Sequence, residues 1–180
     1  MAKDITVEEI LKFAETLIDI KYTLWNGEPL SKNTHPFYVN EIPNMEYIKK
    51  NGLNCAGFIN LLRLKSGKYV PGIDDYKGGT HSWFNYFKDE KCLEIFDYRK
   101  KYPLGTLFLR KYRSITDQGH LSVLYELDKN DFWLNNKIIH SYYDEKENNG
   151  KVGLSILGYS HYSIPEGYYE YIILPENWIL

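Results

Sequence analysis

Residues 52–63, GLNCAGFINLLR, decide the interpretation of the chain, because a cysteine stands there between a helix-capping residue and an apolar run. Asn is among the best N-cap residues, so Asn54 predicts Cys55 in the first turn of a helix that ends at Ser66-Gly67. The positive end of the helix dipole stabilises a thiolate. We therefore expect the pKa of the Cys55 thiol to lie below that of a free cysteine.

Helices are predicted on both sides of this stretch, and strands follow them. The capping box TVEE at residues 6–9 begins a helix expected from Val7 to Asp19, a Pro- and Asn-rich loop runs to Asn44, and a further helix is expected from His81 to Phe87. Short β-branched or aromatic runs follow Pro103, namely TLFLRKY, HLSVLYEL, KIIHSYY, VGLSILGY and YYEYIIL. This order predicts one α+β domain, residues 1–180, with the Cys55 helix packed on an antiparallel sheet.

Composition excludes several function classes. The 180 residues have a formal net charge of −2, whereas phosphate binding needs a basic patch, so we expect no nucleic-acid partner. No apolar run is long enough to cross a bilayer, and the N-terminus lacks a secretory apolar segment. The two cysteines, Cys55 and Cys92, are too few for a disulfide framework, and no CxxC pair suggests zinc. A cytoplasmic location is expected.

Two of the five histidines lie in strand-like runs. His120 begins HLSVLYEL after Gly119, and His140 lies within KIIHSYY. If these runs pair as antiparallel neighbours without a bulge, both imidazoles can project from one face of the sheet near the same end. One imidazole would face Cys55 as a base, and the other would hold the first in its useful tautomer.

Five stretches, in order, resemble the NlpC/P60 family of papain-like cysteine peptidases. FAETLIDIKYTLWNG resembles the opening helix of that family, which ends in a Tyr followed by a Trp-Gly segment. LNCAGFI resembles its nucleophile motif, usually Asp-Cys-Ser-Gly-Phe. PLGTLFL and GHLSVLYE resemble the strand before the histidine and the strand that bears it, and KIIHSYY resembles the strand of the third catalytic residue. The resemblance covers roughly residues 10–142.

The resemblance implies a papain-like fold and a thiol hydrolase that needs no cofactor. Cys55 would be the nucleophile, His120 its base and His140 the residue that orients His120. Tyr22 would line the pocket and help the Cys55 backbone N–H hold the oxyanion. The substrate would be a small peptide or acyl amide, cleaved through a thioester.

Two departures from the family motif bear on the substrate. Family members that cleave cell-wall peptides have Asp and Ser around the cysteine, whereas Asn54 and Ala56 stand there in this chain. A neutral amide and a methyl group replace an anion and a hydroxyl, and charge-assisted hydrogen bonds are about twice as strong as neutral ones. Recognition of the ammonium end of a cell-wall stem peptide is therefore not expected.

Other interpretations of the same residues stay open. Cys55 alone fits a buried structural thiol, and Cys55, His120 and His140 could form a metal-binding set. His161 competes with His140 for the orienting role. The fold would also suit a thiol acyltransferase, a lipid-directed hydrolase or a binding domain without catalysis. An apolar tunnel beside Cys55 would favour the first two, and a short polar cleft would favour the peptidase.

Overall fold

The structure is a computed structural model that describes residues 5–27, 35–72, 78–130, 133–144, 148–159 and 168–180. Its helices are α1 (Val7–Glu15), α2 (Met45–Asn51), α3 (Cys55–Lys65), α4 (Thr80–Asp89) and α5 (Pro175–Trp178). Its strands are β1 (Glu94–Ile95), β2 (Leu107–Arg110), β3 (His120–Glu126), β4 (Lys137–Asp144), β5 (Asn149–Ile156) and β6 (Tyr171–Ile173). Two single 3-10 turns, Trp133–Asn135 and Leu157–Tyr159, flank β4 and β5.

The six strands form one antiparallel sheet in the order β1-β6-β2-β3-β4-β5. The predicted α+β class with an antiparallel sheet is therefore confirmed. The five predicted strand runs match β2 to β6, although their bounds differ from those of the strands by up to three residues at either end. The sequence pattern missed β1, α2 and α5, which have two, seven and four residues.

The predicted starts of α1 and α3 agree with the structure, and the predicted end of α1 is wrong. The helix predicted over residues 81–87 is α4, which is longer by one residue at its start and by two at its end. Thr6 caps α1 with the reciprocal bonds of a capping box, and Asn54 caps α3. However, α1 ends at Glu15 and not at Asp19. The Thr16 hydroxyl bonds back to the Phe13 carbonyl, and the chain then turns until Asp19 adopts a φ of 67° and donates to a carbonyl of β5.

The sheet buries residues on both of its faces. Successive residues of a strand point to opposite faces, and the buried apolar residues accordingly separate into two clusters. One cluster joins the sheet to α1 and α3 through Leu107, Leu109, Leu121, Val123, Ile139 and Val152. The other lies on the opposite face and contains Phe108, Leu124, Ile138, Ile172 and the two tyrosines Tyr168 and Tyr169.

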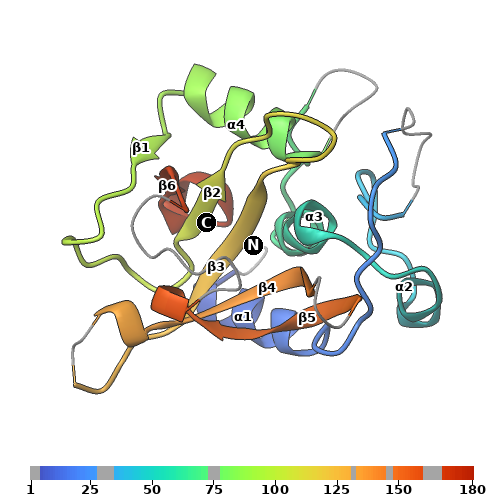
Figure 1. The fold of residues 1–180 in the computed structure, drawn as a ribbon, viewed down its shortest axis with the longest axis horizontal. Coiled ribbons are helices and arrows are strands. Elements are labelled where there is room, and N and C mark those ends of the chain that lie inside the picture. The colour runs from blue at the N-terminus through green and yellow to red at the C-terminus, as the bar shows by residue number, and fades with distance from the viewer. Residues whose placement is uncertain (1–4, 28–34, 73–77, 131–132, 145–147, 160–167) are drawn as a thin grey trace.

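The sheet opens where α3 begins. Pairing of β3 with β4 starts only at Val123 and Ile139, while β3 pairs with β2 as far as His120, and β4 pairs with β5 as far as Asp144. From Val123 towards His120, and from Ile139 towards Asp144, the two halves of the sheet diverge. Figure 1 shows α3 in the angle between β3 and the β4–β5 pair, in contact with β3, β4 and α1. The N-terminus of α3 therefore lies at the opening of the sheet.

Gly57, in the first turn of α3, allows another segment to approach the helix. A Cβ atom added there would lie 1.7 Å from the Pro36 carbonyl oxygen, which belongs to backbone. An Ala in a helix interior normally gains about 1 kcal/mol over Gly. We expect Gly57→Ala instead to lower the free energy of unfolding by roughly 2 kcal/mol, because the backbone must move. Urea unfolding followed by circular dichroism measures this change, and a gain in stability would contradict the close approach.

None of the helices in the described part of the chain has the length and apolar character that crossing a membrane requires.

Candidate active site

Cys55 occupies the first position of α3, where backbone N–H groups lack partners within the helix. The Asn54 side chain accepts the N–H of Gly57 at 2.8 Å, which leaves the N–H groups of Cys55 and Ala56 directed at the cysteine. The Cys55 sulfur also accepts hydrogen bonds from the Leu121 N–H and from the Thr80 hydroxyl. Donors from a helix start, a strand and a second helix thus surround one sulfur atom. Only 5% of the surface of Cys55 is exposed.

Burial determines the acidity of this thiol. Loss of solvent raises the pKa of Cys55 from its ordinary value of 9.0 to about 11, and the surrounding hydrogen bonds only partly offset the rise. The expectation of a lowered pKa is therefore wrong for this structure. The helix dipole contributes about 1 kcal/mol or less at an exposed terminus, whereas desolvation of a charge costs several kcal/mol. A base is therefore needed to ionise the sulfur near neutral pH.

The raised pKa predicts how stability depends on pH. The unfolded chain loses the thiol proton above pH 9, whereas the folded protein keeps it to about pH 11. The unfolded state therefore binds fewer protons in this window, and the free energy of unfolding falls by about 1.4 kcal/mol per pH unit. Cys55→Ser lacks this titration, so the difference in unfolding free energy between wild type and variant should shrink from pH 9 to 11 and stay constant below pH 9. If the curves of unfolding free energy against pH for wild type and Cys55→Ser stayed parallel up to pH 11, the burial of the thiol would be contradicted.

His120 and His140 form a hydrogen-bonded pair. The Nε2 atom of His120 lies 2.7 Å from the Nδ1 atom of His140, and the ring centroids are 5.0 Å apart. The Nε2 atom of His140 lies in turn 2.8 Å from the Oγ atom of Ser155 on β5. Both imidazoles are almost completely buried. The predicted hydrogen bond between two imidazoles on one face of the sheet is confirmed.

The β3–β4 hairpin does contain a bulge, between Leu124 and Glu126. It lies beyond the pairing of Val123 with Ile139, and that pairing brings the two imidazoles to one face. The condition that the hairpin be free of bulges was therefore unnecessary. Only an irregularity between the pairing and either histidine would have separated the rings.

Residues next to the two histidines hold the start of α3 at the opening of the sheet. The Leu121 N–H that bonds the sulfur belongs to the residue directly after His120. On the other side of the opening, the Ser141 hydroxyl, directly after His140, donates to the Leu53 carbonyl at 3.2 Å. The start of α3 is thus fixed to β3 and to β4 one residue beyond each histidine.

Tyr22, predicted to line the pocket, and the two positions that bear on the substrate, Asn54 and Ala56, lie close to Cys55 in the chain or in space. Tyr22 forms a parallel bridge with Leu53, and its ring lies 5.8 Å from that of Tyr143. The Asn54 and Ala56 side chains are buried, Asn54 as the helix cap and Ala56 in the core, and neither lines the cavity described next. A contribution to substrate binding from these two positions would come from their backbone.

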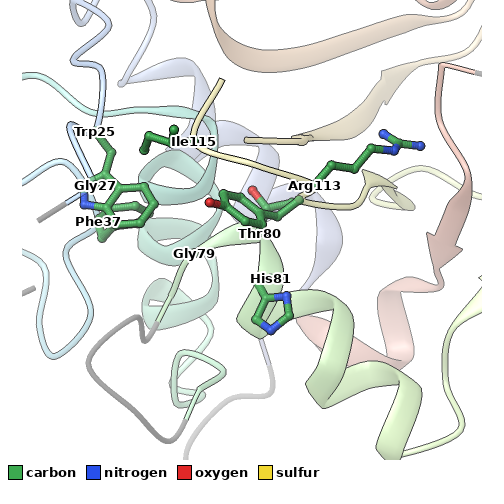
Figure 2. Close-up of a pocket in the computed structure, with 9 residues that line it drawn as sticks. Trp25, Gly27, Phe37, Gly79, Thr80, His81, Arg113 and Ile115 are labelled. Carbon is green, nitrogen blue, oxygen red and sulfur yellow. The ribbon is translucent and has the colours of Figure 1, made fainter. Parts of the chain in front are cut away.

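A cavity of about 640 Å³ adjoins the sulfur through Thr80. Its lining residues come from four segments and are Trp25, Gly27, Phe37, Gly79, Thr80, His81, Tyr112, Arg113 and Ile115 (Figure 2). The size lies within the range of small-molecule sites. Two of the lining residues, Thr80 and His81, lie at the start of α4. No local sequence pattern marks the other lining residues as neighbours, because the fold alone brings their segments together.

The remaining candidates lie elsewhere. Cys92 is half-buried and its thiol bonds the Glu90 carbonyl. His35 is exposed, and His161 lies outside the described residues. Within the described residues, no group of three or more His, Cys, Asp or Glu side chains is arranged to hold a metal ion.

Comparison of the chain with protein-family models, with curated proteins and with solved structures gives no match.

Proposed function

We propose that the protein is a papain-like cysteine hydrolase of the NlpC/P60 type, which cleaves a small peptide or amide through a thioester. One observation carries the proposal. The Cys55 sulfur accepts the N–H of the residue after His120, and His120 is hydrogen-bonded to His140. A nucleophile, a base and a group that orients the base are the parts that such a reaction needs.

The reaction takes place in two stages. His120 takes the thiol proton while the sulfur attacks the amide carbonyl carbon. The oxyanion of the tetrahedral intermediate accepts hydrogen bonds from the N–H groups at the start of α3. The C–N bond then breaks as His120 returns the proton to the leaving amine, which leaves a thioester on Cys55. Water attacks the thioester, His120 takes a proton from it, and collapse of the second intermediate releases the carboxylic acid and restores the thiol.

The histidine pair fits one set of tautomers that serves this reaction. His120 accepts the thiol proton on Nδ1 only if its Nε2 carries a hydrogen. That hydrogen is then donated to Nδ1 of His140, so the hydrogen of His140 is on Nε2 and points at the Ser155 hydroxyl. The 2.7 Å and 2.8 Å bonds thus hold both rings in the required tautomers. His140 and Ser155 act as positioning residues in this scheme.

A second candidate is a thiol acyltransferase or lipid-directed hydrolase with the same three residues. The observation in its favour is that most side chains of the cavity beside Thr80 are apolar or aromatic. Both candidates share the thioester and differ in the acceptor, which is water in one and an amine or alcohol in the other.

The test is to trap the thioester. The protein is mixed with small amide and ester substrates, quenched within the first turnover, and examined by intact-protein and peptide mass spectrometry. We expect the mass of one acyl group on the peptide that contains Cys55. A folded protein whose Cys55 stays unmodified with every substrate, and reacts with iodoacetamide no faster than a denatured thiol, would support a binding domain without catalysis.

A further inference from the structure

The cavity beside Thr80 carries an inference about the substrate that rests on the proposed function. We infer that it binds the acyl portion of the substrate, and that this portion is a neutral aromatic or branched apolar group. The Thr80 side chain both lines the cavity and bonds the Cys55 sulfur. Cys55 itself does not line the cavity, and Thr80 connects the sulfur to this space.

The walls of the cavity are suited to a ring or a branched chain. Trp25 and Phe37 meet edge to face with centroids 5.7 Å apart, and His81 and Tyr112 meet in the same way at 6.2 Å. Ile115 lies close to Gly27, where an added Cβ would be 3.1 Å from its Cδ1 atom. Aromatic and aliphatic walls favour apolar ligands, since burial of apolar surface is the main attractive term for such groups.

The only permanent charge among the nine lining residues is already balanced. The Arg113 guanidinium lies 3.0 Å from Glu170 and 3.5 Å from Asp117. Figure 2 shows its side chain extending away from Trp25 and Phe37. A carboxylate or ammonium in the cavity would lose hydration without gaining an unused opposite charge. The cavity therefore selects against charged acyl groups.

The test compares three p-nitrophenyl esters that acylate thiols, with 3-phenylpropanoyl, acetyl and glutaryl groups. The second-order rate constant for acylation of Cys55 is measured by quenched mass spectrometry. We expect 3-phenylpropanoyl to react at least about tenfold faster than acetyl, relative to the same ratio for free cysteine, because its ring is buried. Glutaryl should show no such gain.

Two charge variants of an accessible wall residue make the test sharper. Ile115 is 46% exposed, so the fold tolerates a polar side chain there. Ile115→Lys and Ile115→Glu should each lower the 3-phenylpropanoyl rate about fivefold or more. Only the lysine should raise the ratio of glutaryl to acetyl, and the glutamate should lower it. Ile95→Lys, at an isoleucine of β1 that is 79% exposed, is the matched control and should change none of the rates.

The outcomes separate this inference from the proposed function. Equal rates for the three acyl groups, or Ile115 variants that behave like Ile95→Lys, would overturn the inference while Cys55 acylation still stood. Failure of all three esters to acylate Cys55 in the folded protein would overturn the proposed function as well.

Discussion

Cys55→Ala abolishes turnover, whereas Cys92→Ala keeps it within about twofold of the wild type. The alanine removes the sulfur that receives hydrogen bonds from the start of α3, from β3 and from Thr80. Loss of a catalytic nucleophile costs several orders of magnitude, up to about 10⁶ in kcat. Cys92 is half-buried at the end of α4 and bonds only a nearby carbonyl.

Steady-state hydrolysis of the ester or amide that reacts best in the trapping experiment measures this difference. Near-UV circular dichroism of both variants checks that the fold is retained. Equal losses from the two substitutions would show that the assay reports thiol oxidation or unfolding, and would remove Cys55 from the proposed role. Cys55→Ser is a third variant for this comparison, since it nearly keeps the size of the side chain and removes the thiol nucleophile.

His120→Ala lowers kcat/KM by about 10³-fold at pH 7, and part of the loss is recovered at high pH. At pH 7 a thiol with a pKa of about 11 is ionised to only about one part in 10⁴ without help. General-base assistance contributes 10²–10⁴-fold in typical enzymes. Without the base, the rate should rise about tenfold per pH unit between pH 7 and 10, because the thiolate fraction then depends on hydroxide alone. A His120→Ala variant whose rate does not rise between pH 7 and 10 would rule out His120 as the base.

His140 should behave differently, because it acts through His120. We expect His140→Ala to lower kcat/KM by about tenfold to a hundredfold. His140→Asn should retain a higher kcat/KM than His140→Ala, since the Asn Oδ1 can accept the His120 Nε2 hydrogen. If the role of His140 were purely structural, His140→Ala and His140→Asn would have the same pH profile. His161→Ala is the comparison, and a larger loss from it than from His140→Ala would transfer the orienting role to His161.

Local patterns predicted the elements that carry the site. The capping residues Thr6 and Asn54 are recognisable in the sequence because a cap bonds residues two or three positions away, and both helices begin where predicted. Short β-branched or aromatic runs predicted β3 and β4, and the hydrogen bond between His120 and His140 followed from their pairing. A two-residue strand such as β1 and a two-turn helix such as α2 are too short to show a period of their own.

The sequence by itself determined the order of helices and strands, the position of Cys55 at a helix start and the pairing of two imidazoles across one hairpin. Only the tertiary structure decided the acidity of the thiol, the contact with Thr80 and the cavity. A cap or a strand register depends on neighbours a few residues apart or across one turn. Desolvation of the sulfur and the walls of the cavity depend on segments between Trp25 and Leu121 that become neighbours only when the chain has folded around α3.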